Sequence, residues 1–183
     1  EEIGSINLPA LVEQRADRLA ADVCIWEGGG RNASGDPFIY LGLKGILTVE
    51  MRSRRLSSDA HSSYATVLPS APWRLLAALN SLRALDGRVL INGFYDDVRP
   101  TTAEEDEAIA GLPDEAEEWS ETFGSNEFLG GLAGEALRRR HLLEPTCNID
   151  GITSGYQGPG TKTVLPAEAS VKMTGRRCNG FAG

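Results

Sequence analysis

Two adjacent carboxylates open the sequence, in the string EEIGS that starts with Glu1 and Glu2. Such a pair can divide the work at a divalent metal ion, because one carboxylate binds the metal while the other accepts a proton from the metal's water. Neighbouring glutamates more often form a solvated surface. The spacing alone leaves both interpretations open.

A third carboxylate, Glu27, ends the apolar run DVCIWE and precedes three glycines. A carboxylate at the end of a buried strand, with flexible backbone after it, is well placed to be a metal ligand. The alternative is a glutamate that simply ends the strand in water.

Two polar strings carry further chemistry. His61 lies in DAHSS, where its imidazole could donate a hydrogen bond to a substrate oxygen, although an exposed loop histidine is the alternative. The string SGYQGPGTKTVLP combines three glycines with Lys162 and Thr163, which suggests close backbone approach and polar contact. It does not match the phosphate-binding pattern G-x-x-x-x-G-K-[ST], because Thr161 precedes the lysine.

The strands that must position these groups are indicated by alternation. Apolar and polar side chains alternate over residues 43–53 and again over 166–174, which predicts half-buried antiparallel strands. Shorter apolar runs predict strands at 22–27 and 146–152, and a turn followed by a strand over 86–94.

Helical spacing predicts the other elements. Leucines recur on one face over residues 8–20 and 70–85, the second helix starting at the N-cap Ser70. Two acidic helices follow, the first opened by a capping box of Thr101 and Glu104, and a third helix ends before Pro145. His141 is expected to complement the dipole at that end. The order predicts an α+β fold: an antiparallel sheet with helices on one face.

Composition limits the class of protein. The chain has 183 residues, 41% of them hydrophobic and 24% charged, with a net charge of -8. The length suits one domain and part of another, and the acidic balance argues against nucleic acid or an anionic membrane as partner. No run of about 18 apolar residues predicts a membrane span, and no C-x-x-C pair occurs. A reducing cytoplasm is therefore expected.

Taken together, the strings EEIGS, DVCIWEGGG, YLGLKGIL, DAHSS, DGRVLINGFYDDVRP and PTCNIDGITSGYQGPGTKTVLPAEASVK resemble metallopeptidase family twenty. This family contains the dinuclear-zinc dipeptidases, aminoacylases and carboxypeptidases. The resemblance is nearest to the carnosine-dipeptidase branch and runs from Glu1 to about Arg176.

For the metal centre, the resemblance implies that Glu1 is the general base, Glu2 a ligand of one metal ion and Glu27 a ligand of the other. It implies two divalent metal ions, zinc with manganese or cobalt as alternatives. The family's H-x-D motif, bridging aspartate and last histidine ligand do not occur in this chain.

For the substrate, the resemblance implies that His61 reaches into the partner subunit's active site and steadies the oxyanion. Thr163 and Arg176 would contact the substrate, a small peptide or N-acyl amino acid, with Arg176 clamping its carboxylate.

The resemblance also implies a domain organisation. Residues 1–41 correspond to part of an α/β catalytic domain, residues 42–177 to a lid domain that forms a homodimer, and residues 178–183 to an atypical tail. The chain is therefore expected to be an inactive fragment of a cytoplasmic peptidase. The alternative is a free-standing module for dimerisation and ligand binding.

Overall fold

The computed structural model describes residues 5–22, 29–32, 35–40 and 42–177. The chain divides into two compact units, Glu1–Tyr40 and Leu41–Gly183. Each unit is treated by itself below.

The described part of the first unit contains two short helices and a small hairpin. Helix α1 spans Leu8–Gln14 and α2 spans Ala16–Leu19, so the predicted helix over 8–20 is interrupted at Arg15. Strands β1 (Gly30–Arg31) and β2 (Pro37–Phe38) pair antiparallel. The predicted strand 22–27 lies almost wholly outside the described residues.

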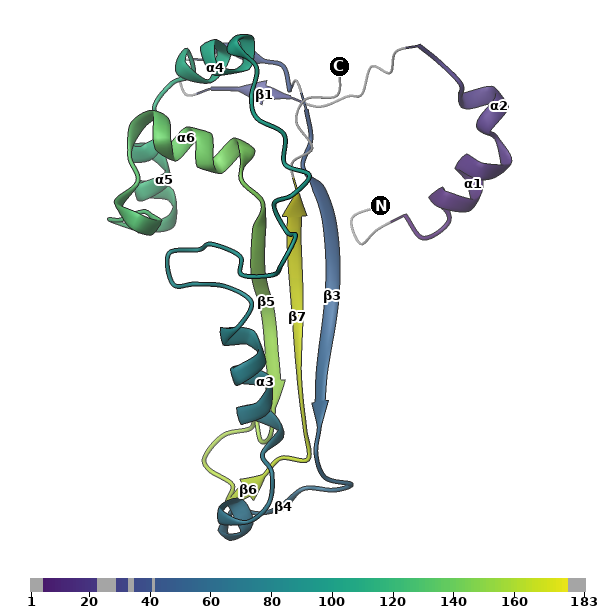
Figure 1. The fold of residues 1–183 in the computed structure, drawn as a ribbon, viewed down its shortest axis with the longest axis vertical. Helices are drawn as coiled ribbons and strands as arrows, with labels where there is room; N and C mark the ends of the chain where they lie inside the picture. Colours follow the sequence, from purple (N-terminus) through teal and green to yellow (C-terminus); the bar gives the residue numbers. More distant parts are fainter. Residues whose placement is uncertain (1–4, 23–28, 33–34, 41, 178–183) are drawn as a thin grey trace. The chain divides into compact units, whose positions relative to one another are not determined.

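A three-stranded antiparallel sheet is the centre of the second unit. Its order is β3 (Gly45–Arg54), β7 (Glu168–Arg177) and β5 (Thr146–Ser154), so the last strand in sequence lies in the middle (Figure 1). The alternating segments at 43–53 and 166–174 are β3 and β7, and the run at 146–152 is β5. These three strand predictions are confirmed.

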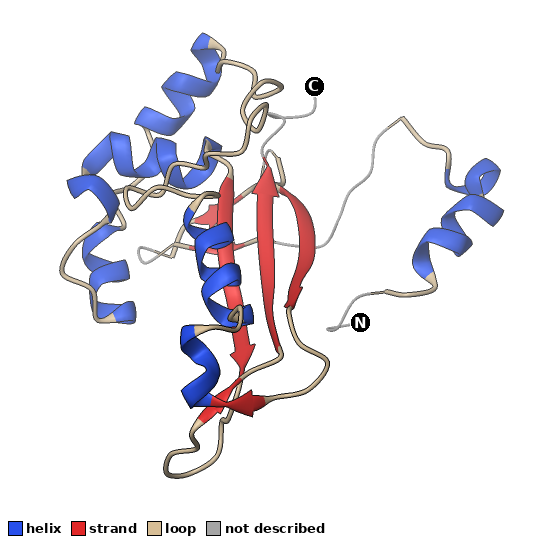
Figure 2. Ribbon diagram, turned by 60° about the horizontal axis from the view of Figure 1, so that its bottom comes forward, coloured by secondary structure: helices blue, strands red, loops and turns tan. Residues whose placement is uncertain are grey.

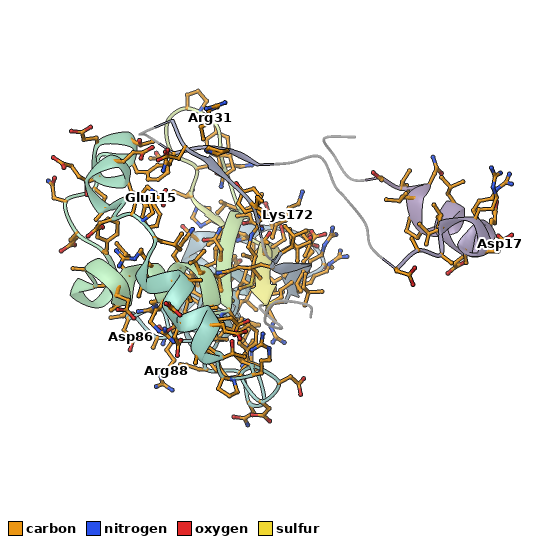
Figure 3. All side chains as sticks on the ribbon, turned by 90° about the horizontal axis from the view of Figure 1, so that it is seen from above. Asp17, Arg31, Asp86, Arg88, Glu115 and Lys172 are labelled. Atoms are coloured by element: carbon orange, nitrogen blue, oxygen red, sulfur yellow. The ribbon has the colours of Figure 1, made fainter. Side chains whose placement is uncertain are left out.

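The two faces of β7 differ as the alternation predicts, whereas in β3 Leu47 and Val49 of the predicted buried face are 65% and 39% exposed. On β7, Ala169, Val171 and Met173 are buried and form the core with α3, which spans Ala71–Asn80. On the opposite face Lys172, labelled in Figure 3, lies across from Glu50 of β3. The helices of the second unit gather on one side of the sheet in Figure 2. The predicted α+β fold, an antiparallel sheet with helices on one face, is confirmed.

Helix α3 begins where the sequence indicates. Its N-cap Ser70 accepts a hydrogen bond from the main-chain N–H of Trp73, at 3.5 Å from N to Oγ. Leu75 and Leu79 point into the core. The helix ends at Asn80, before the predicted end at 85.

Residues 86–94 begin with the predicted turn, but the strand predicted to follow it does not form. The main chain of Val89 forms one isolated bridge with Arg83, and residues 91–97 form turns. Val89 is buried, and its N–H donates to the Tyr95 hydroxyl at 2.9 Å. The buried side chain of Val89 therefore anchors a turn. Asp86 and Arg88, which form a hydrogen bond from the Arg88 main chain to the Asp86 side chain just before Val89, are labelled in Figure 3.

Three helices precede β5, namely α4 (Ala103–Ala110), α5 (Ala116–Phe123) and α6 (Gly134–Leu143). The capping box of α4 is formed by Thr102 and Glu105, one residue later than predicted. The hydroxyl of Thr101 instead binds Asp106 at 2.6 Å, and Asp106 also binds Arg139 of α6 at 2.6 Å. This network joins the first and third helices.

The end of α6 differs from expectation. His141 lies in the last turn, but the cation at the terminal carbonyls is Lys44, whose Nζ donates to the carbonyls of His141 and Glu144. Burial lowers the pKa of His141, and Lys44 lowers it further, while Glu115 opposes the shift. These shifts disfavour the charged form of His141 that a dipole partner needs.

Candidate functional site

A small corner of the second unit brings His61 and Thr163 together, although 102 residues separate them. Strand β4 (Ala60–His61) pairs antiparallel with β6 (Val164–Leu165), so that His61 lies across from Val164. The main-chain N–H of Ser62 donates to the Thr163 carbonyl at 3.2 Å. Backbone pairing thus positions both side chains.

The two side chains contact each other directly. Thr163 Oγ1 lies 3.3 Å from His61 Nε2, at the long end of hydrogen-bonding distance. The ring is exposed to solvent. A histidine N–H and a hydroxyl group therefore share one accessible position, where both can donate to an oxygen atom of a bound molecule.

Asp59 ties this corner to the sheet. Its Oδ1 accepts a hydrogen bond from the main-chain N–H of Ala167 at 2.9 Å, and Arg55 N donates to the Ala167 carbonyl at 2.9 Å. Because Ala167 directly precedes β7, the histidine corner is anchored to the central strand. Sequence analysis noted Asp59 only as a neighbour of His61 and did not assign it this role.

Arg176 does not lie in the corner that holds His61 and Thr163. It is near the opposite end of β7, paired in register with Ile46 of β3 and Thr146 of β5. In Figure 1 the β4–β6 corner and the arrowhead of β7 are at opposite ends of the sheet. The eight-residue step from Glu168 to Arg176 corresponds to about 26 Å along the strand. The sequence-predicted substrate residues thus form two groups, not one.

A cavity of about 560 Å³ adjoins Arg176. Its lining includes two further arginines, Arg83 and Arg140, and the half-buried thiol of Cys147. Burial raises the pKa of Cys147, and the charge of Arg83 opposes that shift. Sequence analysis did not identify these two arginines, because they come from a turn and a helix with no recognisable spacing relative to Arg176.

The predicted metal-binding side chains cannot be placed in this geometry. Glu1, Glu2 and Glu27 lie outside the described residues. Within the described ranges, no group of three or more His, Cys, Asp or Glu side chains could hold a metal ion. The described residues therefore do not provide a site for the implied metal ions.

Comparison with known proteins identifies the lid. A family model described as "Peptidase dimerisation domain" matches residues 41–181. The chain belongs to the M20 peptidase dimerisation-domain family. It is 32% identical over 180 residues to human Beta-Ala-His dipeptidase, covering 95% of this chain and 35% of that protein.

Solved M20 structures share the fold. The M20 family metallo-carboxypeptidase Sso-CP2 from Sulfolobus solfataricus gives a TM-score of 0.90 at 40% identity, over 97% of this chain and 40% of that one. The di-peptidase Dug1p from Saccharomyces cerevisiae gives 0.81 at 26% identity, over 97% and 37%. The chain thus spans between a third and two fifths of the length of these relatives. The resemblance to metallopeptidases is confirmed.

No helix in the described part of this M20 chain is long and apolar enough to cross a membrane.

Proposed function

We propose that this chain is part of a metal-dependent peptidase that hydrolyses the amide bond of dipeptides or N-acyl amino acids. The observation that carries the proposal is the contact between His61 and Thr163. Two donors at one exposed position suit the oxyanion that forms when an amide carbonyl is attacked. The M20 relatives, which include dipeptidases and a carboxypeptidase, support the same reaction class.

The separation of the two groups supports a homodimer. An extended dipeptide spans about 7 Å, whereas the step from Glu168 to Arg176 along β7 is roughly 26 Å, and the corner that holds His61 lies at the opposite end of the sheet from Arg176. The two side chains of one copy therefore cannot hold the same dipeptide. In the proposed dimer, His61 and Thr163 of one copy act on a substrate whose carboxylate is held by the guanidinium fork of the partner's Arg176.

The surface around β5 is suited to such a partner. Strand β5 is an edge of the described sheet, and its Ile149 and Ile152 are 44% and 48% exposed. Trp73 and Leu76 of α3 add exposed apolar area, at 74% and 45%. An unpaired edge beside exposed apolar side chains favours strand addition from a second copy.

Sedimentation velocity tests the dimer. The chain should sediment as a dimer at micromolar concentration, and Ile152→Glu should weaken dimerisation about tenfold or more, because a charge would be buried. Ile91→Glu is the matched control, since Ile91 is similarly exposed, at 42%, and belongs to no strand of the sheet. A monomeric wild-type chain, or equal effects of the two substitutions, would argue against this surface.

The remaining assignments concern the complete protein. We infer divalent metal ions, zinc with manganese or cobalt as alternatives, held by carboxylates that include Glu2 and Glu27, with Glu1 as general base. We place residues 1–41 in the catalytic domain and 42–177 in the lid, and the protein in the cytoplasm. Metal analysis of the purified complete protein, before and after chelation, tests the first inference.

The decisive experiment compares this chain with the complete protein encoded by its gene. The complete protein should hydrolyse dipeptides with dependence on a divalent metal, and His61→Ala should lower kcat about a hundredfold or more. The isolated chain should be inactive. Hydrolysis by the isolated chain would disprove the fragment assignment, and a metal-loaded complete protein with no amidase activity would disprove the proposed reaction.

One observation favours a second candidate function, a free-standing module without catalysis. The second unit has its own core, built from α3 and β7, which a free-standing dimerisation or ligand-binding module would need. If the gene encodes no metal-binding motif beyond this chain, the module is the better assignment.

A further inference from the structure

Ser63 makes two contacts with the ring nitrogen of His61 that does not contact Thr163. The main-chain N–H of Ser63 donates to His61 Nδ1, with 3.2 Å between the nitrogens. The Ser63 hydroxyl oxygen lies 2.9 Å from the same atom. In this arrangement His61 is the N-cap of the short helix η1, which spans Ser62–Thr66.

The chemistry of these contacts decides which nitrogen carries the proton. A main-chain N–H can only donate, so Nδ1 must present its lone pair. In a neutral imidazole the proton then resides on Nε2. The Ser63 hydroxyl faces the same lone pair and must also donate, so the two donors of one residue share a single acceptor.

The other side of the ring completes the arrangement. With its proton on Nε2, His61 donates toward Thr163 Oγ1 at 3.3 Å. The hydroxyl proton of Thr163 is then available to donate outward. The corner thus presents the Thr163 hydroxyl as an outward donor, beside an imidazole N–H that a bound oxygen atom would share with Thr163 Oγ1.

We propose that Ser63 is a positioning residue for His61, holding the ring with Nδ1 as acceptor and Nε2–H directed to the position beside Thr163. The link to catalysis rests on the proposed function. The opposite tautomer would place a lone pair on Nε2, and a lone pair repels a developing oxyanion instead of stabilising it. Ser63 would therefore contribute to the reaction without touching the substrate.

Nuclear magnetic resonance of the 183-residue chain tests the hydrogen bond directly. The sequence contains two histidines, so His141→Gln assigns both rings. At about pH 8.5, where a histidine of ordinary pKa is neutral, we expect a scalar coupling across the hydrogen bond between the Ser63 amide nitrogen and His61 Nδ1. We also expect the proton on Nε2. A protonated Nδ1 with no such coupling would overturn the proposal.

Substitutions separate the two donors. Ser63→Pro removes the main-chain N–H and should abolish the coupling and raise the fraction of Nδ1–H tautomer. Ser63→Ala removes only the hydroxyl and should keep the coupling. It should raise the fraction of Nδ1–H tautomer less than Ser63→Pro does. Ser62→Ala is the matched control and should leave the ring unchanged. If Ser63→Pro does not fold, the wild-type coupling and the pair of alanine variants still decide the result.

Kinetics of the complete protein test the catalytic role. Ser63→Ala should lower kcat about fivefold to tenfold with little change in KM. Ser63→Thr, which keeps a hydroxyl, should retain most of the wild-type kcat. Ser62→Ala should leave kcat unchanged. An unchanged kcat for Ser63→Ala would overturn the positioning role. The proposed function fails separately, if the complete protein hydrolyses no amide while the coupling in this chain is present.

Discussion

At the scale of single residues, the histidine corner depends on a carboxylate that sequence reasoning treated as a neighbour. Asp59 accepts the main-chain N–H of Ala167 and so connects the loop before His61 to the start of β7. The arrangement was not predictable from spacing, because 108 residues separate the two partners. His61 and Thr163 were likewise assigned through family resemblance and not by their distance in sequence.

We therefore predict that Asp59→Ala destabilises the chain by roughly 1–3 kcal/mol, because it leaves a partly buried N–H without its acceptor. Asp59→Asn keeps an acceptor oxygen and should cost less. Urea unfolding measures both variants. Equal losses for the two substitutions would mean that the hydrogen bond to Ala167 is not the stabilising contact.

At the scale of elements, sequence patterns predicted β3, β7 and α3 from apolar side chains that recur on one face, whereas a short apolar run predicted β5. The run 86–94 misled for a physical reason: Val89 is buried as a turn anchor, while the Leu90 N–H donates back to Leu82 at 2.7 Å instead of joining the sheet. A run of apolar residues indicates that side chains are buried. It does not indicate which main-chain group accepts the hydrogen bonds of the run.

The end of α6 leads to a prediction about pH. His141 packs against Trp119, with 4.8 Å between ring centroids, and its pKa is lowered from 6.5 mainly by burial and then by Lys44. The unfolded chain then takes up this proton at a higher pH than the folded chain. Stability should therefore fall as the pH drops below about 6.5.

Chemical unfolding between pH 5 and 8 measures this effect, with the range set by the ordinary titration of histidine at about 6.5. His141→Gln removes the titrating group and should flatten this part of the stability profile. His61→Gln is the control, because it replaces the other histidine of the chain. A profile unchanged by His141→Gln would show that other groups cause the slope.

At the scale of the whole molecule, stability of the second unit should concentrate in the core between α3 and β7. Val171 is 1% exposed in the central strand, whereas Val67 is 75% exposed after η1. Val171→Ala should cost roughly 1–3 kcal/mol, and Val67→Ala should change stability by less than about 0.5 kcal/mol. Thermal or urea unfolding compares the two. A similar loss at both positions would place the cooperative core elsewhere.

The central place of β7 has a consequence for synthesis on the ribosome. Arg54 of β3 pairs with Glu168, so 113 residues must follow β3 before its partner strand begins to emerge. At roughly 5–20 residues per second this interval lasts about 6–23 s. Throughout it the main-chain N–H and C=O groups along the edge of β3 that later pairs with β7 have no partner strand. Such nonlocal pairing slows folding, and it makes the nascent chain a natural client for chaperones that bind exposed strands.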